Sequence, residues 1–272
     1  MNSNYRPQGF KMLPEIVKNL LIINGLMFFA TFVMTNTMGV DLTRILGLHY
    51  FSSEFFKPYQ LVTHVFMHGS FMHLFLNMFA LWMFGNVLEN HWGPKKFLIY
   101  YFVTAFGAAG LHIFVTWFGV HGLEQGIEAL RVSGTPEAFQ TFITGYVPDG
   151  LKSQFVEVRS AWESNPGSSQ LREQAYSYAN QLYSMEVNTP VVGASGAVFG
   201  LLLAFGMLFP NTLIYLYFAI PIKAKYFVAL YGAFELYQGI ANNAGDNVAH
   251  FAHLGGMLFG FILIKFWRSK GH

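Results

Sequence analysis

A serine lies among small residues at the start of a long apolar stretch, in the run Gly-Ala-Ser-Gly at positions 193–196. A later apolar stretch carries His253, followed by Leu-Gly-Gly at 254–256. A serine hydroxyl becomes a nucleophile when a base takes its proton, and histidine is a base suited to neutral pH. The two stretches therefore predict nucleophilic chemistry by Ser195, provided that the fold brings it to His253.

Two further polar side chains lie in another apolar stretch. His73 and Asn77 are four residues apart, so a helix would place them on one face. The tetrahedral intermediate of acyl transfer needs hydrogen-bond donors aimed at its oxyanion, each contributing about 2.7–4 kcal/mol. His73, Asn77 and the backbone N–H of Ser195 are candidates for these donors. Polar groups inside a membrane are costly and therefore suggest function.

Small residues recur every four positions around both candidate catalytic residues. Gly196 and Gly200 show this spacing in one stretch, and Ala252, Gly256 and Gly260 show it in the other. Small residues at this spacing let two membrane helices approach closely. The pattern predicts that the two helices pack together and bring Ser195 to His253.

The composition is that of a chain embedded in lipid. Of the 272 residues, 53% are hydrophobic and 11% are charged, against about 25% charged in ordinary soluble domains. The net charge of +2 and the lack of a long basic run predict no nucleic-acid partner. The absence of cysteine excludes a thiol nucleophile, a cysteine-based zinc site and disulfides.

The hydropathy pattern predicts an all-α membrane protein with six spans, because each apolar stretch approaches the roughly 20 residues that a bilayer requires. The stretches are 16–34, 71–88, 97–120, 191–209, 224–240 and 248–267.

The connecting segments differ in character. We expect 35–70 to be an interfacial loop, Lys95 and Lys96 to mark a short turn, 212–222 to cross the interface and 241–247 to be a polar loop. Segment 121–189 is polar and mixed in charge, which predicts two or three short amphipathic helices in water. Within it, 135–137 reads as a helix start with proline at the first position, and 165–167 reads as a turn.

Four regions follow from this pattern. They are a cytoplasmic arm over 1–15, three spans with the first outer loop over 16–120, an extracytoplasmic helical insertion over 121–189, and three spans with a short cytoplasmic tail over 190–272. The arm lacks the apolar core of a cleavable signal, so we expect the first span to direct insertion itself.

The distribution of Lys and Arg predicts the orientation. With the N-terminus inside, the short cytoplasmic segments would hold ten of the 16 Lys and Arg residues, which is the positive-inside bias. Both termini are then cytoplasmic, and Ser195 and His253 lie at similar depth below the outer surface. We expect a multi-pass protein of a bacterial inner (plasma) membrane. The ten residues are Arg6, Lys11, Lys18, Lys95, Lys96, Lys223, Lys225, Lys265, Arg268 and Lys270.

Taken together, these motifs resemble those of the rhomboid family of intramembrane serine proteases, over roughly 16–118 and 190–268. The resemblance implies a Ser–His dyad with no acidic third member, in which Ser195 is the nucleophile and His253 is the general base and acid. It implies an oxyanion hole made by His73, Asn77 and the Ser195 N–H, and cleavage of transmembrane or juxtamembrane segments of membrane proteins without a cofactor. The supporting residues that match are Gly193, Ala194, Phe199, Glu89 and His68, with Glu89 expected to be a structural hydrogen-bonding residue.

The chain also departs from the family pattern. Many relatives carry Tyr four residues after the serine, stacked on the catalytic imidazole, where this chain has Phe199. The phenyl ring can stack but lacks the hydroxyl. A Trp-Arg pair that is common in the first outer loop of relatives is missing from 36–63, and the insertion at 121–189 is long for the family.

Plainer interpretations stand beside these predictions. Ser195 and His253 could be packing residues, and His250, one turn before His253, is the rival base. His64 and His68 are more typical of loop hydrogen-bonding residues than of catalysts. Together with His73 they could chelate a metal, but the cluster has no carboxylate, and we expect no metal site.

Two other functions compete with proteolysis. A catalytically silent rhomboid-like protein would bind transmembrane clients without cutting them, and intact Ser195 and His253 argue against it. A transporter would show inverted repeats and broken helices at mid-membrane, and the sequence has no internal repeat.

Overall fold

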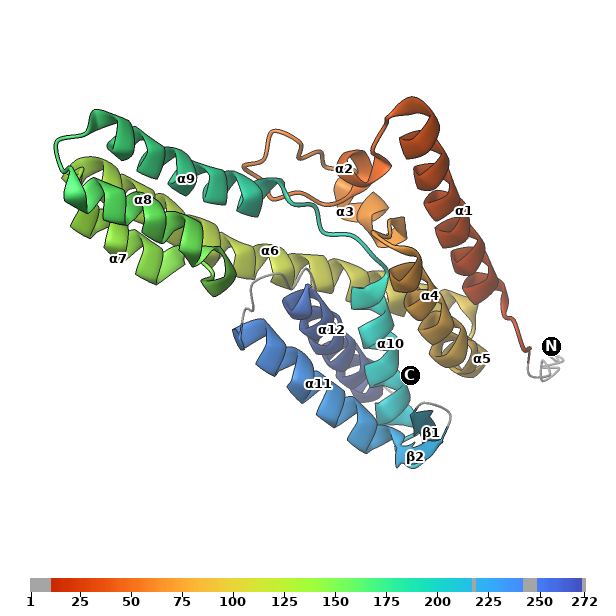
Figure 1. The fold of residues 1–272 in the computed structure, drawn as a ribbon. Helices are drawn as coiled ribbons and strands as arrows, with labels where there is room; N and C mark the ends of the chain where they lie inside the picture. The colour runs from red at the N-terminus through yellow and green to blue at the C-terminus, as the bar shows by residue number, and fades with distance from the viewer. Residues whose placement is uncertain (1–10, 217–218, 242–248, 271–272) are drawn as a thin grey trace, which may run out of the picture.

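The computed structural model describes residues 11–216, 219–241 and 249–270, and most of them are helical (Figure 1). Most of the predicted arm over 1–15, with Arg6, and residues 242–247 of the predicted loop over 241–247 lie outside the described residues. The elements, in chain order, are α1 (Glu15–Met38), α2 (Leu42–Leu46), α3 (Gln60–Thr63), the 3-10 turn η1 (His64–Phe66), α4 (Phe71–Ala80), the π-helical turn η2 (Leu81–Gly85), α5 (Asn86–Trp92), α6 (Pro94–Ser133), α7 (Pro136–Tyr146), the 3-10 turn η3 (Asp149–Leu151), α8 (Lys152–Ser164), α9 (Ser169–Asn188), α10 (Ser195–Leu208), β1 (Leu213–Leu216), β2 (Ile220–Lys223), α11 (Ala224–Ala241) and α12 (His250–Ser269).

Four helical segments of the described chain are long and apolar enough to cross a membrane. They are α1, the continuous run of α4, η2 and α5 over Phe71–Trp92, α6, and α12. Large apolar side chains remain exposed along them; Leu26, Phe29 and Phe32 of α1 are each more than 60% exposed. Apolar surface of this extent indicates contact with lipid.

The other two predicted spans are less clear from length and hydropathy. Helix α10 has 14 residues and is therefore about 21 Å long, shorter than the roughly 30 Å hydrocarbon core. Helix α11 is long enough, but Lys225 and Glu235 are among the polar residues that lower its hydropathy. The count of six spans stays a prediction.

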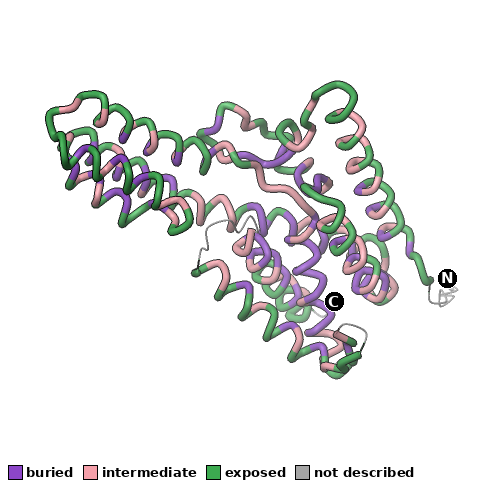
Figure 2. The backbone as a smooth tube through the Cα atoms, in the orientation of Figure 1, coloured by how far each residue is buried: buried purple, intermediate pink, exposed green. Residues whose placement is uncertain are grey.

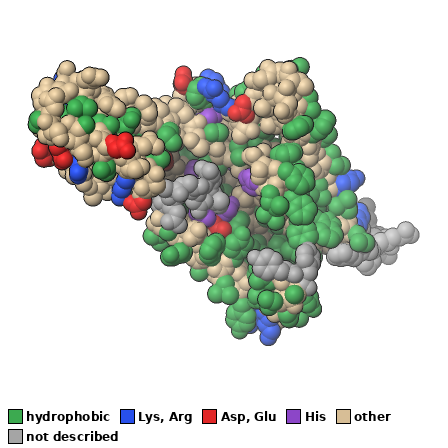
Figure 3. Space-filling model, viewed as in Figure 1, with side chains coloured by type: hydrophobic (Ala, Val, Ile, Leu, Met, Phe, Trp, Pro, Cys, Tyr) green, Lys and Arg blue, Asp and Glu red, His purple; other side chains and the backbone are tan. Residues whose placement is uncertain are grey.

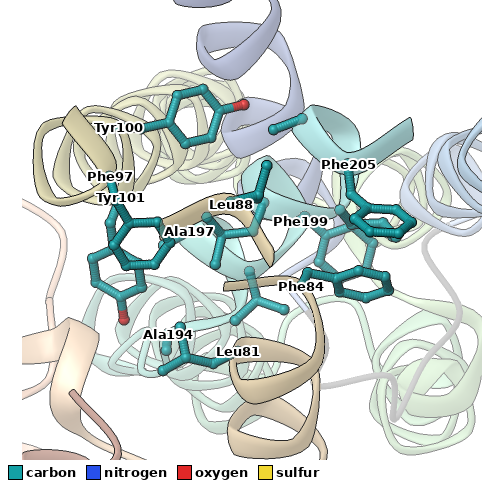
Figure 4. Packing of buried hydrophobic residues seen from close by; sticks show 14 of the residues in the cluster. Leu81, Phe84, Leu88, Phe97, Tyr100, Tyr101, Ala194, Ala197, Phe199 and Phe205 are labelled. Atoms are coloured by element: carbon teal, nitrogen blue, oxygen red, sulfur yellow. The ribbon is translucent and has the colours of Figure 1, made fainter. Parts of the chain in front are cut away.

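Helix α10 lies at the centre of the bundle. Most of its residues are buried (Figure 2), and it packs against α6, α12 and the α4–α5 segment. Figure 4 shows Ala197 and Phe205 of α10 facing Leu81, Phe84 and aromatic rings of α6. A helix that is apolar all round is buried on all sides, so Ser195 at its start is held by the core.

The structure begins α10 at Ser195, four residues later than the predicted span. Val191 lies in an extended segment, where it and Leu48 exchange two backbone hydrogen bonds of 2.9 and 2.8 Å. Pro190 cannot donate to a helix, and Gly193 has a φ of +121°, outside the helical region. The helix therefore begins four residues later than its hydropathy predicts.

The small residues bring three helices together, not two. A Cβ on Gly256 of α12 would overlap the backbone of Gly196, as the spacing predicts. Gly200 and Gly260 face α6 instead, where a Cβ on each would meet Thr104 and Tyr100. The expected contact between α10 and α12 is therefore present at Gly196, which meets both Ala252 and Gly256, while Gly200 and Gly260 pack against α6.

Helix α6 is longer than the predicted third span. Its only break from α5 is Gly93, so Lys95 and Lys96 lie in its first turn and not in a connecting turn. Most of its residues after 123 are good helix formers such as Leu, Glu, Gln and Ala, and it ends at Gly134 with a φ of +60°. Forty residues at about 1.5 Å each exceed a bilayer, so its second half extends beyond the bundle.

The end of α6 joins α7, α8 and α9 in a projecting helical arm (Figure 1). This arm has its own apolar core, which includes Leu130, Phe139 and Trp162. As the sequence predicts, Pro136 starts α7 with the Thr135 side chain accepting from the Ala138 N–H. The described arm thus buries apolar side chains independently of the bundle.

Two connections differ from expectation. Segment 212–222 forms an antiparallel pair, β1 with β2, with Leu213 opposite Lys223. The interfacial crossing predicted there is therefore a short strand pair. Segment 35–70 holds the short α2, α3 and η1 and no span, because its polar residues and turns leave no long apolar run.

Glu89 connects the α5 end of its segment to α1. Its two carboxylate oxygens accept from the backbone N–H groups of Ile16 (3.0 Å) and Val17 (2.8 Å). The first N–H groups of a helix have no acceptor within it, and a carboxylate there also meets the positive end of the helix dipole. Glu89 therefore holds the start of α1 against the bundle.

We expect Glu89→Ala to lower the free energy of unfolding by about 1–3 kcal/mol, because a buried amide would lose a charged acceptor. The measurement is thermal unfolding in detergent. Glu15→Ala is the control, because Glu15 is exposed in the turn of α1 that holds Ile16 and Val17. Equal shifts in the two variants would show that these bonds contribute nothing particular.

Candidate active site

Ser195 and His253 meet between α10 and α12. His253 Nε2 lies 2.9 Å from Ser195 Oγ. Ser195 is the first residue of α10 and His253 is the fourth of α12, so the contact lies at the same end of both helices. His253 is 8% exposed and Ser195 is half-buried. An imidazole at this distance can accept the hydroxyl proton.

Phe199 fixes the plane of the imidazole. Its ring stacks on that of His253 with centroids 4.0 Å apart and planes within 8°. Phe199 follows Ser195 by one helical turn, so α10 supplies both the hydroxyl and the stacking ring. The phenyl ring thus stacks as the sequence predicts, without the tyrosine hydroxyl of many relatives.

Glu235 of α11 contacts the other ring nitrogen of His253. Its Oε2 lies 2.8 Å from His253 Nδ1 and 2.7 Å from His250 Nδ1. The structure therefore places His253 between Ser195 and a carboxylate, and it places His250, the rival base, on the same carboxylate oxygen.

Gly193 leaves a space beside Ser195 and His73. A Cβ at Gly193 would lie 2.9 Å from His73 Nε2 and 3.7 Å from the backbone N of Ser195. As the first residue of α10, Ser195 is among those whose N–H groups have no acceptor within the helix. Two of the three predicted oxyanion donors thus border one small space. The Gly193 N–H itself donates to the His64 carbonyl (2.9 Å), which fixes the loop.

The third predicted donor, Asn77, has one clear partner. Its Nδ2 donates to the His73 carbonyl at 2.9 Å. An amide NH₂ has two hydrogens, so this bond orients the group and leaves the second hydrogen for another acceptor.

His68 and His64 lie in the segment before α4, next to the other site residues. The His68 ring lies 5.0 Å from that of His73 between centroids. No described residue bonds either His68 ring nitrogen, and burial, followed by the effect of His73, lowers the pKa of His68 to about 4. The ring is therefore neutral at pH 7. His64 Nδ1 contacts the Gln60 carbonyl at 2.7 Å.

The comparison with protein families decides the class. The family model of the rhomboid domain matches residues 56–122 and 173–270, more than half of the chain. The chain belongs to the rhomboid family. With its apolar helices, this rhomboid is an integral membrane protein.

One curated relative is an uncharacterised rhomboid protein of Schizosaccharomyces pombe, described as mitochondrial. It is 26% identical over 216 residues, which cover 77% of this chain and 52% of that protein. The chain thus spans about half the length of the curated relative. The family model leaves residues 123–172 unmatched, and these form most of the projecting arm.

Sequence reasoning did not identify Glu235 in this rhomboid chain. It is the only acidic residue of α11 and is 3% exposed. A carboxylate within an otherwise apolar helix is the signal that could have found it. Figure 3 shows histidine side chains and an acidic side chain near the middle of the visible face, among hydrophobic side chains of the bundle.

Among the described residues, the group most similar to a metal site is not the predicted alternative of His64, His68 and His73. It is Glu235, His250 and His253, whose potential ligand atoms lie within 4.8 Å of one another. Two imidazoles and a carboxylate are zinc ligands in many proteins. Here hydrogen bonds from both imidazoles to one carboxylate oxygen also account for the geometry.

Proposed function

We propose that this chain is an intramembrane serine endopeptidase that cleaves transmembrane or juxtamembrane segments of membrane proteins. The observation that carries the proposal is the 2.9 Å contact between Ser195 Oγ and His253 Nε2, at the buried start of α10. Membership of the rhomboid family supports it.

In the proposed reaction, Ser195 Oγ attacks the scissile carbonyl carbon while its proton passes to His253 Nε2. The oxyanion that forms is stabilised by the Ser195 N–H, His73 and the second N–H of Asn77. His253 then gives the proton to the leaving amine as the C–N bond breaks. In the second half of the reaction, water attacks the acyl carbon and gives a proton to His253, which returns it to Ser195 Oγ as the acyl group is released.

The substrate must unwind before it can react. A transmembrane helix satisfies its own backbone hydrogen bonds, so its carbonyls are shielded from attack. Substrates with helix-breaking residues near the cut are therefore favoured. Because α10 is short and Ser195 lies at its start, the hydroxyl sits below the outer end of the neighbouring helices, where water must reach it.

The proposed topology has six spans, with both termini in the cytoplasm and the projecting helical arm outside. The Lys and Arg distribution supports it, and the gap in the family match supports an insertion between the third and fourth spans. The prediction of a bacterial inner (plasma) membrane rests on the sequence reading alone.

The test uses purified protein in detergent with a single-pass membrane substrate and a fluorophosphonate probe. We expect the substrate to be cut once and the probe to label Ser195, each read by mass spectrometry. A probe that labels no serine, with intact substrate, would favour a silent rhomboid-like protein that binds transmembrane clients.

A further inference from the structure

We infer that Glu235 is a positioning residue for His253, so that the site works as a serine–histidine–glutamate triad. This inference rests on the proposed function and adds an acid to the two residues that the sequence predicts. Its basis is a continuous chain of contacts: Ser195 Oγ to His253 Nε2 at 2.9 Å, and His253 Nδ1 to Glu235 Oε2 at 2.8 Å.

The carboxylate decides which nitrogen of His253 is the base. To take the serine proton, Nε2 must hold a free lone pair, so the ring proton must be on Nδ1. A neutral imidazole has one donor and one acceptor nitrogen, and the partner of one sets the role of the other. An ionised carboxylate accepts hydrogen bonds and cannot donate them. Glu235 Oε2 therefore holds the ring proton on Nδ1 and leaves the lone pair of Nε2 facing Ser195.

The same carboxylate balances the charge that forms during the reaction. When Ser195 Oγ bonds to the substrate carbonyl carbon, its proton moves to Nε2, and the ring carries one positive charge. Glu235 keeps its negative charge and its bond to Nδ1–H throughout. When the C–N bond breaks, the Nε2 proton passes to the leaving nitrogen and the ring is neutral again.

Burial makes this contact specific. Glu235 is 3% exposed, and an ionised carboxylate out of water needs partners that donate to it. His253 and His250 both meet its Oε2, at 2.8 and 2.7 Å. His250, three residues before His253 on α12, is thus a second anchor for the carboxylate.

The face of α11 around Glu235 holds the imidazole from a second direction. Tyr231 lies one turn before Glu235, and its ring packs on Phe199 with centroids 5.0 Å apart. Phe199 in turn stacks on His253. The helix therefore restrains both the plane of the imidazole, through the aromatic pair, and its rotation within that plane, through the carboxylate.

The experiment compares Glu235→Gln, which keeps size and polarity, with Glu235→Asp, which keeps charge. We expect Glu235→Gln to lower kcat about 10- to 100-fold with KM nearly unchanged, less than the about 10⁴-fold of the best-known triad because Phe199 also orients the ring. Glu235→Asp should retain more activity than Glu235→Gln. A packing role predicts the reverse order, so full activity of Glu235→Gln, or less activity in Glu235→Asp, would overturn the inference.

Two controls complete the experiment. Tyr237→Phe, at a 67% exposed position of the same helix, should leave kcat unchanged. A zinc chelator should leave the wild-type rate unchanged, and a loss equal to that of Glu235→Gln would overturn the inference in favour of a metal held by Glu235, His250 and His253. If wild type neither cuts nor labels, the proposed function fails; if wild type cuts and Glu235→Gln matches it, the triad alone fails.

Discussion

Replacing Ser195 with alanine should lower the cleavage rate by about 10³-fold or more, the largest effect expected in this chain. The substitution removes the oxygen that forms the acyl bond in the proposed reaction and leaves His253 without the proton it would take. A methyl side chain at this position continues the small-residue run at the start of α10, where Gly196 and Ala197 are already buried, so the helix should keep its packing. The loss should therefore appear in kcat and not in stability.

The measurement is initial-rate cleavage of a single-pass substrate, paired with thermal unfolding in the same detergent. Ser269→Ala, at the opposite end of α12, is the matched control and should keep the wild-type rate, because Ser269 Oγ donates to the Phe266 carbonyl, far from the site. Cleavage by Ser195→Ala at the wild-type rate would mean that another group is the nucleophile.

Ser195 and His253 could be predicted from the sequence because each lies in a recognisable local pattern. Ser195 lies in a run of small residues and His253 lies beside two glycines, so each is marked by its own neighbours. The structure brings these two residues together. The contact between Gly196 and Gly256 that accompanies them also follows from spacing alone.

Glu235 could not be found in that way, because its role depends on a contact between helices. Nothing in the run around Glu235 relates it to His253, and the two residues meet because α11 packs against α12. The polarity that makes Glu235 notable also lowers the hydropathy of α11 below that of a standard span. The hydropathy pattern therefore predicts an apolar helix there and does not reveal a role for its one acidic residue.

The ends of helices were predicted less well than their positions, for a related reason. Hydropathy falls after residue 120, but a helix continues until a residue stops it, and α6 meets none before Gly134. Conversely, hydropathy is already high at Val191, but Pro190 and the positive φ of Gly193 keep the chain out of the helix until Ser195. Hydropathy measures the solvent around a segment, whereas backbone chemistry determines where the helix ends.

Gly193→Ala should lower kcat about 10²- to 10³-fold, the second largest effect, which is the usual loss for one oxyanion donor. The added methyl would stand 2.9 Å from His73 Nε2 and within 3.7 Å of the Ser195 N. In the proposed reaction it would therefore occupy the space that the substrate oxyanion needs between the two donors. KM should change far less, because these donors bind the transition state more strongly than the ground state.

The substitution also strains the backbone, because Gly193 has a φ of +121° and such conformations cost other residues about 1–3 kcal/mol. Gly39→Ala separates the two effects. Gly39 also has a positive φ, of +67°, but a Cβ there meets nothing within 4 Å. If the oxyanion space lies at Gly193, thermal unfolding should shift in both variants while kcat falls in Gly193→Ala alone. Equal activity in the two variants would place the oxyanion elsewhere.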